Sequence, residues 1–317
     1  MNIIFELADV RTVGITGHVR PDGDCVGSVL GLYNYIKHNM PHIEVDAYLE
    51  QPGKEFGYIK NINEIKNEPD TSKVYDLFVV LDCSDVERIK PFAACFKNAK
   101  RTICIDHHAS NIAYADKNLI LPEASSTCEV LFNTLDEDKI TEEVAECLYT
   151  GIVHDTGVFK YSCTSKDTMA IAGKLMAKGI PYSDIIDNSF YKKTYVQNQV
   201  LGRALVESVL FYHGQCIFSA LSTKDLEFFG VEGKDLGGII EQLRLTEGVE
   251  VAIFLYQTGI HEYKVSMRSK KYIDVSRIAV HFGGGGHVRA AGVTMQGTVH
   301  DIINNIGAQL ELQFSGR

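Results

Sequence analysis

The sequence lacks long apolar runs, closely spaced cysteine pairs and an excess of basic residues. Its apolar stretches, such as Phe78-Val79-Val80-Leu81, are only a few residues long. A membrane-spanning helix needs roughly 20 such residues, so we expect no membrane segment. The first residues contain neither a basic region nor a small-residue cleavage site, which predicts no signal peptide. We therefore expect a cytoplasmic protein.

The eight cysteines form no C-x-x-C pair. Zinc ribbons and thioredoxin-like motifs require close pairs, so both are disfavoured. An even count is weak evidence for disulfides in a chain without a secretion signal. Most of these cysteines lie in apolar surroundings and are predicted to be small buried side chains. They are Cys25, Cys83, Cys95, Cys104, Cys128, Cys147, Cys163 and Cys216.

The net charge of −10 follows from 31 basic and 41 acidic residues. It argues against a long nucleic acid bound along a broad basic surface. It is compatible with a short, highly charged substrate held by a few cations in a cleft. Part of the negative charge can belong to metal ligands, which bound divalent ions would offset locally.

The length of 317 residues favours two domains. In the first half, strand-like segments alternate with helix-like ones, which predicts an α/β fold with a parallel sheet covered by helices. Ligands in such sheets bind beyond the carboxyl ends of the strands. The predicted strands cover residues 12–16, 44–49, 77–81 and 102–105, and the clearest early helix covers 25–38.

The later part of the chain changes from helical to strand-rich. Helices are predicted over 141–154 and 166–178, and strands over 209–212, 216–221, 249–256 and 263–267, before a final helix over 299–312. We expect a first domain over 1–190, a linker helix or hinge over 191–204, and a smaller α/β domain over 205–317.

One imidazole and two carboxylates, those of His18, Asp22 and Asp24, fall within seven residues in a strand-to-helix turn that Pro21 helps to fix. Two like charges held this close are costly unless they are neutralised, and divalent cations are the simplest remedy. The alternative is helix capping, with Asp24 as a possible N-cap residue. Capping explains one aspartate well, but it explains the whole H-x-x-P-D-x-D set poorly.

Further polar residues follow the ends of predicted elements. Asp82 follows an apolar strand, where a single aspartate is most often a turn former. Asp106, His107 and His108 end the next strand, and two adjacent imidazoles there are unusual. Asp155 ends a predicted helix between glycines, where a simple turn is the alternative reading.

Imidazole and carboxylate ligands without a thiolate suit Mn²⁺, with Mg²⁺, Co²⁺ or Zn²⁺ also possible. Two ions about 3.5–4 Å apart can clamp an in-line displacement at phosphorus and generate a hydroxide nucleophile. The residue set therefore predicts a two-metal phosphoesterase.

These pieces, in this order, resemble the motifs of the DHH phosphoesterase superfamily, named after the triplet at 106–108. Residues 282–287, with Ala290-Ala291-Gly292 behind them, look like the signature of the DHHA1 domain. Residues 265–269 resemble that domain's phosphate-binding strand. The length and two-domain plan look most like the nanoRNase/pAp-phosphatase group.

The resemblance implies a role for each candidate residue. One ion would be held by His18, Asp22 and Asp82. The other would be held by Asp24, Asp82, His107 and Asp155, so that Asp82 bridges the two. His108 would face the substrate, and Asp106 would orient an imidazole, as metal-ligating histidines commonly require.

The glycine run is predicted to bind substrate, because Gly284, Gly285 and Gly286 let backbone amides approach a phosphate closely. His287 and Arg268 could add charge-assisted hydrogen bonds to a terminal phosphate. The alternative is a flexible loop, and a Walker loop is excluded because Lys-Ser/Thr is absent. The resemblance to the phosphate-binding strand also makes Ser269 a candidate for substrate binding. Arg20 and Ser28 are weaker candidates, for contacts near the metals, and Ser125-Ser126-Thr127 is predicted mainly to cap a helix.

We therefore expect hydrolysis of short oligoribonucleotides, pAp, or linear or cyclic dinucleotides, all of which offer the same reacting group. One alternative is an inorganic pyrophosphatase or exopolyphosphatase, which the glycine–histidine signature disfavours. Another is a nucleotide sensor without turnover, which the full ligand set disfavours. A homodimer is the default expectation for the assembly.

Overall fold

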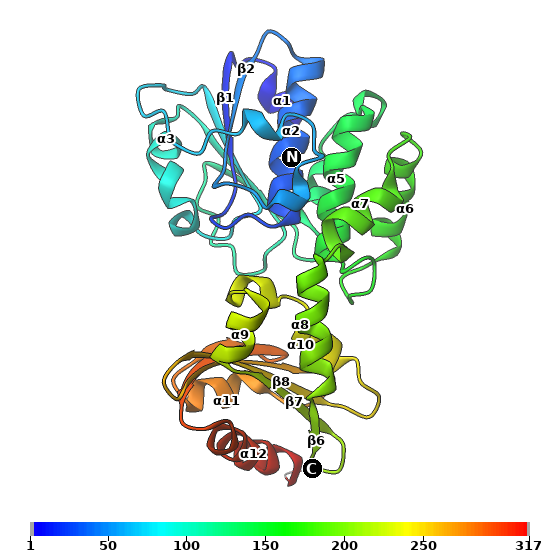
Figure 1. Ribbon diagram of the computed structural model, residues 1–317. Helices are drawn as coiled ribbons and strands as arrows, with labels where there is room; N and C mark the ends of the chain where they lie inside the picture. The colour runs from blue at the N-terminus through cyan, green and yellow to red at the C-terminus, as the bar shows by residue number, and fades with distance from the viewer. Residues whose placement is uncertain (1–2, 316–317) are drawn as a thin grey trace. The chain divides into compact units, whose positions relative to one another are not determined.

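The structure is a computed structural model that describes residues 3–315. The chain forms two compact units, Met1–Lys192 and Lys193–Arg317. Each unit contains one sheet with helices against it (Figure 1). The predicted α/β class is confirmed: a parallel-sheet unit comes first and a smaller mixed-sheet unit follows.

The sheet of the first unit has five parallel strands in the order β2-β1-β3-β4-β5. β3 and β4 are buried throughout, as expected for inner strands covered on both faces. The sequence predicted four of these strands, and missed β5 because its KNLI segment is half-polar at a sheet edge. The strands are β1 (Thr12–Thr16), β2 (Glu44–Tyr48), β3 (Leu77–Leu81), β4 (Thr102–Asp106) and β5 (Lys117–Ile120).

Alternate side chains of these strands enter two separate cores, one on each face. Ile15, Val79 and Leu81 belong to the core shared with the helices α2 (Gly23–Asn39) and α5 (Glu142–Asp155). Phe78 and Val80 belong to an aromatic-rich core on the other face, against α3 (Ala93–Asn98). The smaller helices of this unit are α1 (Ile3–Leu7), α4 (Thr127–Phe132), α6 (Lys166–Met176) and α7 (Tyr182–Ile186).

Helices α2 and α5 pack antiparallel at very short range because glycines line their contact. A Cβ atom at Gly27 would lie 2.5 Å from the Cys147 carbonyl oxygen, and one at Gly151 would lie 2.6 Å from Asp24 Oδ1. Side chains at these positions would push the helices apart. The close approach brings the first turn of α2 beside the last turn of α5, where Asp24 and Asp155 lie.

The second unit contains a six-stranded sheet in the order β10-β11-β9-β8-β7-β6. Only β7 and β8 pair in parallel; the other pairs among the described strands are antiparallel. The strands are β6 (Val209–Phe211), β7 (Cys216–Leu221), β8 (Val251–Gly259), β9 (Glu262–Ser269), β10 (Gly285–His287) and β11 (Ala290–Gln296).

Two apolar clusters cover the two faces of this sheet. Residues of α8 (Tyr195–Val206) and α10 (Ile239–Arg244) pack on one face with Ala252 and Phe254. Residues of α11 (Val275–His281) and α12 (Val299–Ser315) pack on the other with Val265 and Met267. Within residues 3–315, no helix combines the length and the apolar character that crossing a membrane requires.

The glycine contact between α2 and α5 predicts a difference between two alanine variants. Gly27→Ala should lower stability by about 1–3 kcal/mol, because the new methyl group meets backbone that cannot move aside. Gly31→Ala, one turn further along α2, should be near neutral, since its nearest neighbour is the flexible end of Leu148 at 3.0 Å. Thermal unfolding of both variants checks this, and equal losses would contradict it.

Candidate metal centre

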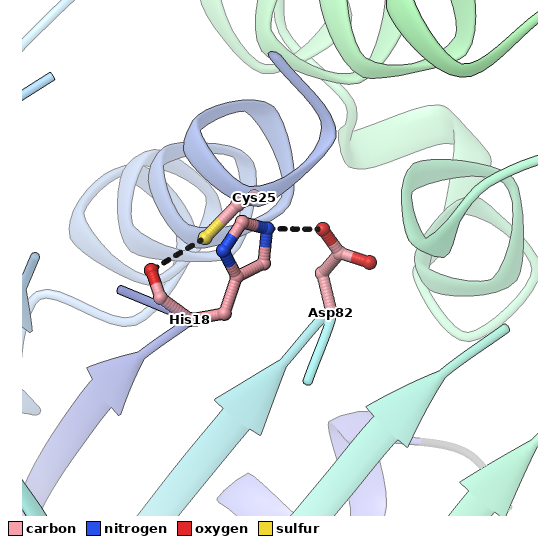
Figure 2. Close-up of side chains that lie close together, drawn as sticks. All are labelled: His18, Cys25 and Asp82. Atoms are coloured by element: carbon pink, nitrogen blue, oxygen red, sulfur yellow. Dashed lines mark hydrogen bonds and ion pairs between the residues drawn. The ribbon is translucent and has the colours of Figure 1, made fainter. Parts of the chain in front are cut away.

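The candidate residues of the first unit lie where its parallel strands end. His18 follows β1 by two residues, Asp82 follows β3 directly, and Asp106 is the last residue of β4. Because β1, β3 and β4 are neighbours in the sheet, their carboxyl ends lie together. Figure 2 shows His18 and Asp82 side by side beyond these ends, beneath the first turn of α2.

Asp82 lies between two groups of ligand-type side chains. Its Oδ2 is 3.4 Å from His18 Nε2, while its Oδ1 is 3.7 Å from His107 Nε2 and 3.6 Å from His108 Nδ1. Its backbone has φ 54°, a left-handed conformation that is uncommon for residues other than glycine and is often found at functional sites. The two oxygens of one carboxylate therefore face different partners.

The first group consists of His18, Asp22 and Asp82. His18 Nδ1 lies 2.9 Å from the Val19 carbonyl oxygen. Because a carbonyl oxygen can only accept a hydrogen bond, Nδ1 carries a proton. His18 Nε2 then faces Asp22 Oδ1 at 3.6 Å as well as Asp82. Asp22, not Asp24, is the N-cap residue of α2 and accepts a hydrogen bond from the Cys25 amide. The alternative that Asp24 caps this helix was wrong, because the cap lies two residues earlier in the chain.

The second group consists of Asp24, His107 and Asp155, together with Asp82. His107 Nε2 is 3.0 Å from Asp155 Oδ2 and 3.9 Å from Asp24 Oδ2. This nitrogen is buried, yet none of the described acceptors lies in the direction that a hydrogen bond requires. A buried nitrogen aimed at three carboxylates without a bond is expected where a cation binds.

The electrostatics of the second group also fit a cation. Burial, and then the charges of Asp82 and Asp155, raise the pKa of Asp24 well above its ordinary value. Burial likewise raises the pKa of Asp155, against the opposing effect of His107. Carboxylates packed this closely repel one another unless protons or metal ions lie between them.

The carboxylates around the two imidazoles favour the protonated form of each ring. Burial lowers the pKa of His18, but its interactions with Asp22 and Asp82 outweigh burial and raise that pKa to about 10. His107 behaves in the same way: burial opposes protonation, Asp155 and Asp24 favour it, and the pKa rises to about 10. Imidazole nitrogens and carboxylate oxygens are a ligand set that suits Mn²⁺, Zn²⁺ and related ions.

Cys25 also lies at this site, which the sequence did not predict. Atoms of His18, Cys25 and Asp82 lie within 4.8 Å of one another. The thiol donates to the His18 carbonyl oxygen at 3.8 Å, as drawn in Figure 2. Burial, followed by the charges of Asp82 and Asp22, raises the pKa of this thiol well above its ordinary value. Cys25 is therefore a protonated neighbour of the candidate ligands in the metal-free protein.

Asp106 fixes the position of His108. Its carboxylate is fully buried, and Oδ1 lies 2.7 Å from His108 Nδ1 and accepts a hydrogen bond from the His107 amide. Asn111 donates to the other oxygen at 2.6 Å. The hydrogen bond from Asp106 raises the pKa of His108, although burial opposes it. The His108 side chain is 35% exposed, so its ring can be reached from solvent.

Thr127 contacts two of the candidate ligands, which its predicted role as part of a helix cap did not indicate. Ser126 caps α4 as expected, but Thr127 joins the candidate metal centre. Its amide donates to Asp24 Oδ2 at 2.6 Å and its hydroxyl donates to Asp82 Oδ1 at 3.1 Å. The Cys128 amide donates to Asp24 Oδ1 at 2.9 Å. These contacts join residues 45 to 104 positions apart, and no local pattern in the sequence signals them.

Arg20 and Ser28 have contacts of a different kind. Arg20 is exposed, and its amide donates to Glu50 Oε2 at 2.6 Å. Ser28 is fully buried, and its hydroxyl donates to the Cys25 carbonyl oxygen at 3.2 Å. Their contact with substrate stays a prediction.

In the second unit, Arg268 and His287 lie on the same face of the sheet. Arg268 on β9 pairs with Ala290 on β11, which pairs with His287 on β10. Side chains paired directly across antiparallel strands project to the same face. The next row on this face contains Gly285 and Gly292. The two polar side chains therefore stand beside small residues that leave room for a ligand.

Part of the glycine run forms a strand: Gly285 and Gly286 belong to β10, and Gly283 and Gly284 precede it. The flexible-loop alternative was therefore wrong for Gly285 and Gly286. Gly285 and Gly286 pair with β11. A Cβ atom at Gly286, where φ is 144°, would lie 2.5 Å from the Ala290 carbonyl oxygen, and one at Gly284 would lie 2.6 Å from Val293 Cβ. Close approach of the two strands requires glycine at these positions. Ser269 is buried, and its hydroxyl donates to the Ile273 carbonyl oxygen at 2.6 Å.

Two family models match the chain. The DHH family, N-terminal domain, matches residues 12–152, which include every candidate ligand except Asp155. The DHHA1 domain matches residues 213–311, which include Arg268 and the glycine run. The chain belongs to the DHH–DHHA1 family. The predicted resemblance is thus confirmed for both domains.

Several relatives of this DHH–DHHA1 protein are similar over most of their length. A bifunctional oligoribonuclease and PAP phosphatase NrnA from Thermus thermophilus is 29% identical over 289 residues, 89% of this chain and 84% of that protein. The Bacillus subtilis protein of the same name is 25% identical over 291 residues, 90% of this chain and 89% of that protein. A crystal structure of an exopolyphosphatase-related protein from Bacteroides fragilis has a TM-score of 0.84 at 24% identity, covering 98% of this chain and 94% of that one, and it supports the fold.

Metal binding should release protons from the two imidazoles. His18 and His107 must be neutral to act as ligands, whereas their pKa values of about 10 keep both protonated near neutral pH. We expect the apparent Mn²⁺ affinity to rise with pH up to about pH 10. Calorimetry in buffers of different ionisation enthalpy measures the released protons. A Mn²⁺ affinity that does not change between about pH 7 and pH 9 would contradict this assignment.

The Cys25 thiol donates to the His18 carbonyl oxygen, so we expect a metal centre without sulfur. Co²⁺-loaded protein should lack a sulfur-to-cobalt charge-transfer band in the near ultraviolet, and Cys25→Ala should leave the visible spectrum unchanged. A band present in the wild type and in Cys128→Ala, but absent from Cys25→Ala, would show instead that Cys25 is a ligand.

Proposed function

We propose that this chain is a metal-dependent phosphoesterase that hydrolyses short oligoribonucleotides and pAp, with dinucleotides as related substrates. The observation that carries the proposal is the position of Asp82, whose two carboxylate oxygens face two separate groups of ligand-type side chains. Membership of the DHH–DHHA1 family supports the proposal. So do the names of the relatives, which are oligoribonucleases and PAP phosphatases.

The proposed ligands follow the two groups. His18 and Asp22 would hold one ion, and Asp24, His107 and Asp155 would hold the other, while Asp82 bridges both. Mn²⁺ is the ion that we propose, because the ligand set combines imidazole with several carboxylates. When bound, two such ions supply Lewis acidity at phosphorus and a strong nucleophile at neutral pH.

His108 is the proposed catalytic residue of the protein itself. Its Nδ1 is committed to Asp106 at 2.7 Å, so its Nε2 is the atom available to a phosphoryl oxygen or a leaving group. Asp106 would hold the ring in this tautomer, and its own position is fixed by Asn111. A raised His108 pKa favours the protonated imidazole, which can stabilise developing negative charge.

Substrate recognition is proposed to involve the second unit. Arg268 and His287 would contact a terminal phosphate, while the backbone of residues 284–286 and the hydroxyl of Ser269 help to shape the site. A short substrate needs few basic side chains, so a net charge of −10 is no obstacle. We also propose a cytoplasmic location, since the reducing cytoplasm keeps thiols free and all eight cysteines are free in the structure.

Asp82→Asn tests the bridging role. The substitution keeps size and shape but removes the charge, so kcat should fall by on the order of 10³-fold or more as metal stabilisation of the transition state is lost. Asp85→Asn is a matched control, because Asp85 follows the same strand but caps a short helix through the Glu87 amide. Full activity of Asp82→Asn, with unfolding temperatures similar to the wild type, would refute the proposal.

A substrate panel decides among the reactions. The purified protein with Mn²⁺ should hydrolyse di- to pentaribonucleotides and pAp with higher kcat/KM than pyrophosphate. Pyrophosphate as the best substrate would overturn the proposed specificity and favour a pyrophosphatase. Tight nucleotide binding without turnover of any substrate would favour a nucleotide sensor.

A further inference from the structure

One carboxylate in the second unit holds two arginine side chains. Glu241 Oε2 is 2.9 Å from Arg244 Nε, and Glu241 Oε1 is 3.0 Å from Arg268 Nε. Glu241 and Arg244 belong to α10, whereas Arg268 belongs to β9. The contact between Arg268 and Glu241 joins residues 27 positions apart, so it fixes the end of the helix against the strand.

Both ion pairs use the Nε atom of the arginine. A guanidinium group has five N–H donors, and a bond at Nε leaves the terminal amino groups free to bind a second partner. Arg268 Nη1 donates to the Met267 carbonyl oxygen at 3.1 Å, and among residues 3–315 its Nη2 has no hydrogen-bond partner. The side chains are 22% and 32% exposed, for Arg244 and Arg268 respectively. Both guanidinium groups are thus held in place while remaining open to solvent.

This arginine pair lies on the face of the sheet that carries His287. Arg268 pairs with Ala252 on β8, and Ala252 belongs to the same apolar cluster as Ile239, Ile240 and Leu243 of α10. The helix that carries Arg244 therefore packs on the same face as the Arg268 side chain. Arg268 is itself in register with His287 through Ala290.

Two guanidinium groups sharing one carboxylate leave a net positive charge of one, before His287 is considered. A phosphodiester carries a single negative charge, whereas a terminal phosphomonoester carries ≈ −1.5 to −2 near pH 7 and offers three acceptor oxygens. Arginine binds such oxygens in a bidentate manner. The several free N–H donors therefore suit the three acceptor oxygens of a terminal phosphomonoester better than the two of an internal diester.

We propose that Arg244 is a second phosphate-binding arginine, that Glu241 is the positioning residue for both arginines, and that this pair selects substrates with a terminal phosphomonoester. The inference rests on the proposed function, in which the second unit binds the end of a short nucleotide. It adds a binding residue that lies outside the segments 265–269 and 282–292, which resemble the DHHA1 signature. It also predicts which oligonucleotide ends the protein prefers.

The test compares 5′-phosphorylated diadenylate with diadenylate that ends in a 5′-hydroxyl, using the full chain with Mn²⁺. Arg244→Gln should raise KM for the phosphorylated substrate by about tenfold, the typical effect of one charge-assisted hydrogen bond. Its kcat should change little, and KM for the hydroxyl substrate should stay near the wild-type value. Arg244→Lys should recover part of the loss, because it keeps the charge without the bidentate geometry.

Glu241→Gln tests the positioning role. It leaves both arginines in place but removes the carboxylate that orients them. KM for the phosphorylated substrate should therefore rise, while KM for the hydroxyl substrate should not fall. Arg277→Gln is the matched control. Arg277 pairs through Nε with Asp274, three residues earlier in the chain, just as Arg244 pairs with Glu241. It lies on α11, whose residues pack on the opposite face of the sheet, and this variant should bind like the wild type.

Calorimetric binding of the phosphorylated diadenylate in EDTA separates this inference from the proposed function. If the wild type hydrolyses neither substrate with Mn²⁺, the proposed function fails, while weaker binding by Arg244→Gln in EDTA still supports the arginine pair. Equal losses for both substrates, equal losses in Arg277→Gln, or no binding in EDTA would overturn the inference.

Discussion

The mutual repulsion of three carboxylates, those of Asp24, Asp82 and Asp155, is the constraint around which the first unit is built. Asp24 and Asp82 are almost completely buried, and an imidazole nitrogen of His107 lies among all three. Such a group costs free energy unless protons or cations lie between the carboxylates, and the pKa values of Asp24, Asp155 and His107 are raised accordingly. The surrounding structure must hold these side chains in place against that cost.

Three parts of the fold do this. The parallel sheet brings the ends of β1, β3 and β4 together, which places His18, Asp82 and His107 within reach of one another. Close packing of α2 against α5 through Gly27 and Gly151 brings Asp24 to Asp155. The first amides of α4 neutralise part of the Asp24 charge through two short hydrogen bonds. Each part depends on residues far apart in the chain.

The candidate sites of the two units differ in their charged side chains. The first unit concentrates negative charge in a buried site where divalent cations can bind, and the second presents arginine and histidine side chains above small residues. The net charge of −10 for the whole chain therefore does not indicate the local charge at either site. In each unit, buried or half-buried acidic groups set the position of the polar side chains that we propose as ligand contacts.

The sequence predicted what local patterns determine. Runs such as Leu77–Leu81 read as buried strands because apolar residues fill both faces, and the polar residues after them marked the ligand edge of the sheet. Strand β5 was missed because an edge strand needs no such run.

Tertiary contacts account for the other differences. The sequence could not show that Thr127 reaches two carboxylates or that Cys25 lies beside His18, because both depend on how helices dock. It also could not show that Arg268 shares Glu241 with Arg244. The glycine run was expected to serve backbone approach to a ligand, which stays a prediction, and the structure shows its close approach to a neighbouring strand.

The claim on which the account depends most is that Asp82 bridges two ions. Electron paramagnetic resonance of the protein titrated with Mn²⁺ tests it directly, because two Mn²⁺ ions joined by one carboxylate are magnetically coupled. The account predicts two bound ions per chain and a coupled spectrum that is lost in Asp82→Asn. Binding of a single ion, or two ions with an uncoupled spectrum in the wild type, would contradict it.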